Sequence, residues 1–153
     1  MIEKFTDISN VVTACGVLLA AWSLWMARSL SQSSFEDGLA KEYRELVRDI
    51  PVDVLLGREV EPEKAIKVRE LVFNYLDLTN EQAYLRCKGR IRKSTWYEWA
   101  EGARFNLSLP MFHAVWEEVK QEAPDMFTEL RRLEAENFEV DPRCWKIRLI
   151  CVK

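Results

Sequence analysis

Histidine is nearly absent from this chain of 153 residues, which contains only His113. The sequence also lacks an HExxH zinc motif, a P-loop, a GxSxG nucleophile motif and a glycine-rich dinucleotide fingerprint. The formal net charge is −3, so the chain as a whole does not attract nucleic acid. These absences argue against the common hydrolase and dehydrogenase classes, and the sequence predicts no catalytic residue.

Cysteine is sparse and lacks the spacing of a metal site. The four cysteines are Cys15, Cys87, Cys144 and Cys151, with no CxxC pair and no histidine pairing. Small secreted domains held together by disulfides carry denser cysteines. We therefore expect reduced thiols in a cytoplasmic domain, with no metal and no other cofactor.

Charge is missing from one long segment. Residues 8–27 read ISNVVTACGVLLAAWSLWMA, and a helix of this length spans roughly 30 Å, the thickness of a hydrocarbon core. Trp22, Trp25 and Arg28 near its end suit the interface between lipid and water. The pattern predicts a transmembrane helix over residues 8–30.

A cleaved signal peptide and a buried core helix are the alternatives to an anchor. Glu3 and Asp7 precede the apolar segment and no clean A-x-A site follows it, which disfavours a signal peptide. A core helix rarely runs so far without a charge. The anchor is the preferred interpretation.

The cations around the segment predict its orientation. Lys4 precedes the helix, whereas Arg28, Lys41, Arg44 and Arg48 follow it. Because cytoplasmic flanks carry the excess of lysine and arginine, we expect the C-terminal domain in the cytoplasm and the anchor in the inner (cytoplasmic) membrane.

Small or weakly polar residues form one face of the predicted anchor, at steps of four and three. Small residues let helix backbones approach closely, and a repeat of 3.5 residues favours a left-handed supercoil. The pattern predicts a homo-oligomer, as a dimer in preference to a pore, although membrane helices are generally rich in such residues. The face consists of Ser9, Thr13, Gly16, Ala20, Ser23 and Ala27.

Residues 33–137 have the periodicity of a mainly α-helical cytoplasmic domain, a small helical bundle joined by short connectors. Capping boxes and prolines mark the expected helix starts, and Gly89 marks one expected end. The expected starts are Ser33 with Glu36, Pro62, Thr95 with Glu98, Pro110 and Pro124. The short apolar segment VDVLLG, which ends at Gly57, cannot be assigned to a helix or a strand from its sequence.

Two further features concern the core and the tail. Asn80 shares a helix row with Leu76 and Tyr84, which predicts a buried amide that ties its helix to a neighbouring loop rather than a ligand site. Residues 138–153 are expected to be extended, because alternation from Trp145 onward is typical of a β-strand.

A basic run brackets Gly89, between the end of one predicted helix and the start of the next. The simplest interpretation is that cations favour a helix C-terminus. A second interpretation is a site for phosphate, as an anionic lipid headgroup or a nucleotide, or for RNA. The candidate anion-binding residues are Arg86, Lys88, Arg90, Arg92 and Lys93.

The region from Leu71 to Trp116 carries a recurring pattern of packing residues. Its elements are Tyr75 to Leu78, Asn80-Glu81, Gly89-Arg90-Ile91, Trp96 with Trp99, and Pro110 to Trp116. In these residues, about a third of the chain, the sequence resembles a broad, uncharacterised group of short bacterial proteins with one N-terminal transmembrane helix and a small helical cytoplasmic domain. The resemblance implies an anchor and a fold and no activity.

Three functions are compatible with the sequence. The favoured one is a membrane-anchored cytoplasmic interaction or sensing module that self-associates and engages a protein partner or an anionic ligand. The alternative is a membrane-perturbing effector, for example in antiviral defence, whose cytosolic domain binds a nucleotide or nucleic acid. A tethered hydrolase using His113 and nearby acids such as Glu117 is the weakest, since a structural or surface histidine is the simpler interpretation.

Overall fold

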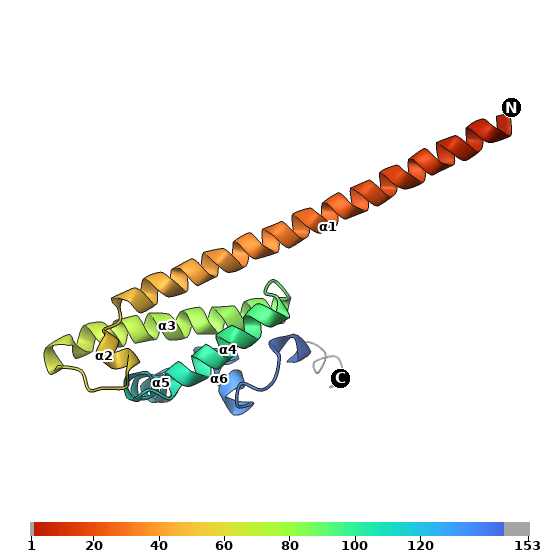
Figure 1. Ribbon diagram of the computed structural model, residues 1–153. Helices are drawn as coiled ribbons and strands as arrows, with labels where there is room; N and C mark the ends of the chain where they lie inside the picture. The colour runs from red at the N-terminus through yellow and green to blue at the C-terminus, as the bar shows by residue number, and fades with distance from the viewer. Residues whose placement is uncertain (1, 146–153) are drawn as a thin grey trace, which may run out of the picture. The chain divides into compact units, whose positions relative to one another are not determined.

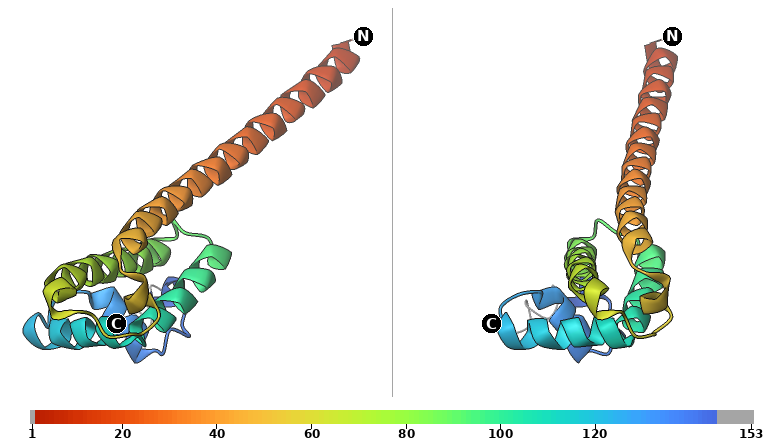
Figure 2. Two further views of the ribbon diagram at one scale, coloured as in Figure 1. Left: turned by 60° about the vertical axis from the view of Figure 1, so that its left-hand side comes forward. Right: turned by 90° about the vertical axis from the view of Figure 1, so that its left-hand side faces the viewer.

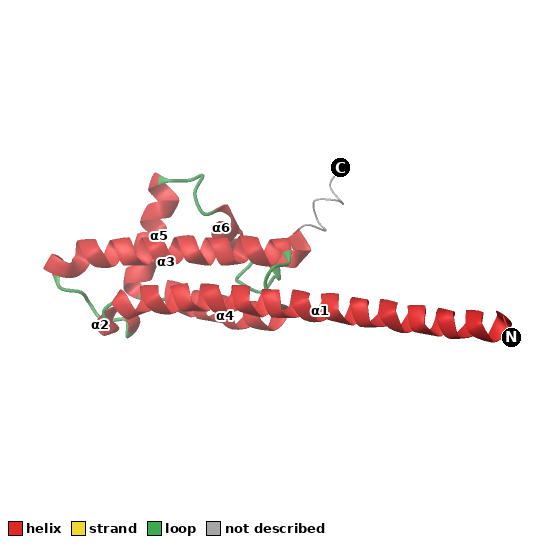
Figure 3. Ribbon diagram, turned by 90° about the horizontal axis from the view of Figure 1, so that it is seen from above, coloured by secondary structure: helices red, strands yellow, loops and turns green. Residues whose placement is uncertain are grey.

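The structure, a computed structural model, describes the backbone of residues 2–145 and the side chains of residues 13–145. All regular elements in this part of the chain are helical (Figures 1 and 3), which confirms a mainly α protein. They are α1 (Ile2–Asp49), α2 (Val52–Leu55), α3 (Pro62–Lys88), α4 (Lys93–Leu107), α5 (Pro110–Glu122), α6 (Thr128–Ala135) and the 3-10 turn η1 (Pro142–Cys144). The chain divides between Asp37 and Gly38 into two compact units.

The first unit is helical from Ile2 onward and exposes the apolar residues whose side chains are described. From Thr13 to Leu30 every residue is exposed. Large apolar side chains in this segment keep 52–74% of their surface accessible, and the rings of Trp22 and Trp25 lie 5.4 Å apart. This N-terminal helix is long and apolar enough to cross a membrane, and unlike a core helix its apolar window has no buried residue.

The predicted helix start at Ser33 is wrong, because α1 continues through it from Ile2 to Asp49. The stretch from Ser29 to Ser34 contains neither proline nor glycine, so nothing interrupts the backbone hydrogen bonds of the helix. Inside a continuous helix each amide already has its partner, and a capping box is not needed there.

Helix α3 is the central element of the second unit. It contacts α4, α5, α6 and η1 (Figure 2). Val68, Val72, Leu76 and Ala83 on this helix are at most 1% exposed. The core is therefore built around α3, and any site near its ends is held by several elements at once.

Two helix starts and one helix end follow the sequence signals. Pro62 and Pro110 occupy the first turns of α3 and α5, where a missing N–H costs nothing. Gly89 ends α3 in the left-handed conformation with φ 78°, and its N–H donates to the carbonyl of Arg86. The same conformation occurs at Gly57 (φ 71°), which ends the previously unassigned segment containing α2.

Two other predicted starts are displaced along the chain. Helix α4 begins at Lys93, before Thr95, because the Trp96 N–H already donates to the Arg92 carbonyl at 3.0 Å. Helix α6 begins at Thr128 rather than at Pro124. The residues after Pro124 form a turn instead, which ends at the positive φ of Phe127.

The predicted hydrogen-bonding role of Asn80 is confirmed, but the residue is half-buried rather than buried. Its side-chain oxygen accepts hydrogen bonds from the backbone N–H groups of Glu129 and Leu130, both at 3.1 Å. These amides belong to the first turn of α6, which has no cap from its own N-cap residue. Asn80, which is half-buried, thus caps α6 from the middle of α3.

The end of the described chain packs on the second unit as a turn. Residues 142–144 form η1, and Trp145 is 3% exposed with its indole N–H donating to Glu136 at 2.7 Å. The Arg132 guanidinium lies 4.5 Å from the centre of the same ring. The expected strand falls almost wholly on residues 146–153, outside the described residues.

Candidate functional site

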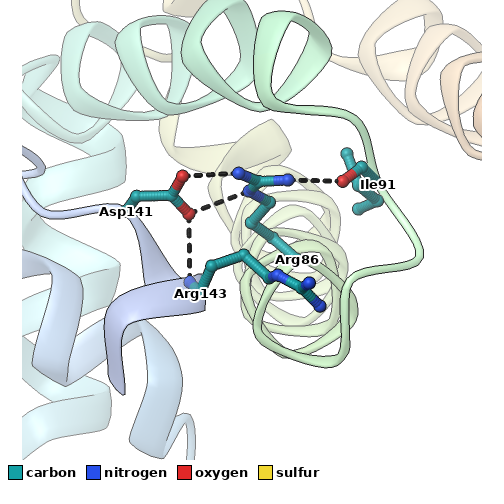
Figure 4. A network of polar contacts seen from close by, with 4 residues as sticks. All are labelled: Arg86, Ile91, Asp141 and Arg143. Carbon is teal, nitrogen blue, oxygen red and sulfur yellow. Dashed lines mark hydrogen bonds and ion pairs between the residues drawn. The ribbon is translucent and has the colours of Figure 1, made fainter. Parts of the chain in front are cut away.

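The α3–α4 connection, where the basic run lies, is organised by one buried arginine. Arg86 is 7% exposed, and its Nε and Nη2 donate to the two carboxylate oxygens of Asp141 at 2.8 and 2.5 Å. Its Nη1 donates to the Ile91 carbonyl at 2.7 Å (Figure 4). One guanidinium therefore joins the end of α3, the connecting loop and the residue before η1.

This geometry separates Arg86 from the rest of the predicted anion site. Each of its three nitrogen groups donates to a protein oxygen, and its charge is matched by a carboxylate. An incoming anion would have to displace Asp141 from a bidentate pair, the strongest geometry for this interaction. We assign Arg86 to the framework of the loop and not to ligand binding.

Asp141 is ionised as the partner of this pair. Burial works to raise its pKa, but hydrogen bonds from Arg86 and from the Arg143 N–H, with the charges of Arg86 and Lys93, hold the pKa below its ordinary value. The Arg143 N–H donates to Oδ1 at 3.0 Å, so Asp141 also caps η1. A lowered pKa means that the ion pair persists throughout the neutral range.

Arg143 joins the basic run from a distant part of the sequence. Its guanidinium lies directly against Gly89: a Cβ added there would come within 1.7 Å of Nη1. The φ of 78° favours glycine at this position, and a Cβ there would also force the flexible Arg143 side chain to move. The charge sits at the C-terminus of α3, where the helix dipole favours a cation.

The exposed cations form a cluster that we call the basic collar. Ile91, in the middle of the loop, is 1% exposed and packs into the core. Its neighbours Arg90 and Arg92 are exposed. Lys88 and Lys93 are exposed as well, and their ammonium groups lie 4.8 Å from the Tyr84 ring and 5.5 Å from the Tyr97 ring. The basic collar consists of Lys88, Arg90, Arg92, Lys93 and Arg143.

The sequence reveals four of the five collar residues but not Arg143, which is 54 positions beyond Gly89 along the chain. No local pattern connects the two, because their proximity depends on the pairing of Arg86 with Asp141. The collar can attract a multivalent anion such as a phosphate.

The lone histidine is a surface residue. His113 lies in the first turn of α5 with 61% of its side chain exposed, and its Nδ1 is 3.9 Å from a carboxylate oxygen of Glu117. No group of three or more histidine, cysteine or acidic side chains gathers around a possible metal position in the described part of the chain. The arrangement fits the surface interpretation of His113.

The described part of the small-residue face of α1 is exposed. Thr13, Gly16, Ala20, Ser23 and Ala27 are all exposed, and a Cβ added at Gly16 would meet no atom within 4 Å. The side chain of the sixth member, Ser9, lies outside the described side chains. The face has room for a second helix, and its use stays a prediction.

Comparison of the chain with protein families, curated proteins and solved structures finds no match. The resemblance of residues 71–116 to short bacterial membrane proteins therefore stays a prediction, and functional inference rests on the residues of this chain.

Proposed function

We propose that the chain is a single-pass protein of the cytoplasmic membrane whose helical domain acts in the cytoplasm as an interaction or sensing module. The observation that carries the proposal is the exposure of the apolar segment, where eight large apolar side chains from Val17 to Leu30 are exposed and have no cover from the described residues. Burying such side chains in lipid contributes on the order of 10–20 kcal/mol in total. The cations that follow the segment favour a cytoplasmic C-terminus.

Fractionation of cells tests this proposal. The full chain should remain in the membrane pellet after an alkaline carbonate wash and dissolve only in detergent. A C-terminal tag should resist external protease until the cell is opened. Recovery of the chain in the soluble fraction, or of a mature form that has lost its first thirty or so residues, would contradict it.

Self-association through α1 is the second part of the proposal. Leucine at position 16 would fill the space that lets two backbones approach, so Gly16→Leu should convert the oligomer to monomer in mild detergent. Molar mass from light scattering in the same detergent measures the change. Ala21→Leu, off the small-residue face, is the matched control and should keep the wild-type mass; a monomeric wild type would refute the oligomer.

We also propose that the basic collar binds a phosphate-bearing anion at the inner face of the membrane. Lys88→Gln with Lys93→Gln removes two collar charges whose ammonium groups lie near the rings of Tyr84 and Tyr97. At about 1 kcal/mol per charge, affinity should fall roughly thirtyfold. Titration of the detergent-solubilised chain with pyrophosphate and, separately, with a short-chain phosphatidylglycerol distinguishes a free anion from a lipid headgroup.

The control for this measurement changes the same net charge at the other end of α3. Lys64→Gln with Lys67→Gln removes two exposed cations far along the helix from Gly89. This variant should bind both probes as the wild type does. Equal losses in the two variants would show attraction by overall charge rather than a collar site.

A further inference from the structure

A cavity of about 300 Å³ lies inside the second unit, away from the basic collar. It is bordered by the last turns of α1 (Gly38 onward), by α3 and by α4. Small residues leave the space open: Ala40, Gly102 and Ala103 all line it. Its volume is at the lower end of the range for small-molecule sites, which suits a single ring system rather than an extended ligand.

Gln82 is the feature of this cavity that the fold does not explain. Its side chain lines the space, the residue is 6% exposed, and no side-chain hydrogen bond among the described residues involves its amide. Neither amide atom is sealed in the core, since Trp116 Nε1 is the one fully buried side-chain polar atom without a partner among the described residues, so the Gln82 amide is open to the cavity that it lines. The Gln82 amide offers a donor and an acceptor side by side. A ligand that pairs with it must therefore present an acceptor next to a donor.

Aromatic side chains form the walls around this amide. Tyr43, Tyr75 and Trp99 border the cavity, and the rings of Tyr43 and Tyr75 lie 6.1 Å apart. Tyr75 is held in place because the Asn106 side-chain N–H donates to its hydroxyl oxygen at 2.9 Å. Burial raises the pKa of Tyr75 to about 12, so its ring stays neutral. These walls suit a flat, uncharged ring that can stack.

The rim adds one charge of each sign. Arg44 and Glu98 line the cavity and both are exposed. Their charges cancel, so the rim does not select a strongly charged ligand over a neutral one. The site thus differs from the basic collar in the chemistry that it recognises.

Gly102 has no packing reason to be glycine. It lies inside α4, where glycine is unfavourable, and a Cβ at this position would meet no atom within 4 Å. A side chain here would instead extend into the space that the residue lines. The residue keeps the cavity open and offers a position at which to close it without disturbing the core.

We infer that this cavity binds a nucleobase or nucleoside, with the Gln82 amide paired to the donor–acceptor edge of the base and Trp99 and Tyr43 against its faces. Glutamine reads adjacent donor and acceptor groups on a base in this bidentate way. The inference is independent of membrane anchoring and of the collar, because every residue in it belongs to the second unit.

Binding of nucleosides to the full chain in nonionic detergent tests the inference. Adenosine, guanosine and cytidine are the probes, with ribose and indole as controls that lack the base edge or its acceptor. Calorimetry and saturation-transfer NMR should show at least one nucleoside binding with a Kd below about 1 mM, and neither control binding as tightly. Absence of binding by all three nucleosides, or equal binding of indole, overturns it.

Two variants locate the site. Gly102→Leu should abolish nucleoside binding, whereas Gly38→Leu, at the other helical glycine of the second unit with open space around it, should bind normally. Gln82→Leu should weaken binding by roughly 5- to 150-fold. Unchanged affinity in Gly102→Leu or Gln82→Leu overturns the proposed site.

The melting temperature distinguishes a ligand-binding role of Gln82 from a structural one. Because its amide lacks a partner, Gln82→Leu should leave the melting temperature of the ligand-free protein unchanged or raise it. A clear fall in melting temperature would show that the amide stabilises the empty fold, and would contradict the inference even if binding were lost.

Discussion

Two arginines in the middle of the uncharged segment, Val17→Arg with Leu19→Arg, should markedly lower the share of the protein in the membrane fraction. Each arginine near the centre of a bilayer costs about 2.5–3.5 kcal/mol on insertion, so the pair opposes insertion by roughly 5–7 kcal/mol. Both positions are exposed and lie within the apolar segment, so the change leaves no cavity in the fold. The measurement is the share of the chain that resists an alkaline wash.

Leu30→Arg provides the control for this prediction. Residue 30 follows Arg28 at the end of the apolar segment, where a long cationic side chain can reach the aqueous interface. This variant should fractionate as the wild type does. If the double arginine variant also stayed in the membrane, the exposed apolar face of α1 would serve another purpose, such as contact with a protein.

The second large effect is expected from Asp141→Ala. Removing the carboxylate leaves the Arg86 guanidinium, 7% exposed, without its charge partner, and breaking a buried pair in this way costs about 3–5 kcal/mol. For a domain of this size the melting temperature should fall by more than about 10 °C. Thermal unfolding followed by circular dichroism measures the change.

A double variant separates what the ion pair contributes to stability from the penalty of leaving one buried charge without its partner. Arg86→Met with Asp141→Leu removes both charges, so no buried charge is left alone, and part of the lost stability should return. Recovery will be incomplete because the Ile91 carbonyl also loses its donor. A double variant less stable than Asp141→Ala would mean that the residues act in some way other than as a pair.

The same pair predicts how stability depends on pH. Because the pKa of Asp141 is lower in the folded state than its ordinary value of 3.8, its contribution is complete above that value and is lost as the pH falls through the folded pKa. The difference in unfolding free energy between wild type and Asp141→Asn should therefore be largest at neutral pH and shrink below about pH 4. Urea titrations at several pH values measure it.

Local signals in the sequence were reliable where a single residue determines the backbone conformation. Pro62, Pro110 and Gly89 act through their own φ angles or a missing N–H, so the bounds that they mark agree with the structure. The proline and glycine signals depend on neighbours within a few residues. That the Asn80 amide needs a partner was also predictable from its apolar helix row, but the partner amides of Glu129 and Leu130 lie 49 and 50 residues away.

The helix starts that were predicted wrongly involve competition between alternatives, and the position of Arg86 depends on a contact across the chain. Ser33 and Thr95 can cap a helix, but helix α1 passes through the first and α4 begins before the second, since an uninterrupted helix satisfies more amides. Arg86 looked like its basic neighbours because Asp141 is 55 residues away. No pattern within the basic run distinguishes the one arginine that becomes buried.

The separation of Arg86 and Asp141 has a consequence for synthesis of the chain. At about 5–20 residues per second, the ribosome adds Asp141 roughly 3–11 s after Arg86. During that interval the nascent loop around Gly89 has neither its carboxylate partner nor the covering guanidinium of Arg143. A translation product that stopped before Asp141 would contain α1 to α6 complete and still lack the closure that holds this loop in shape.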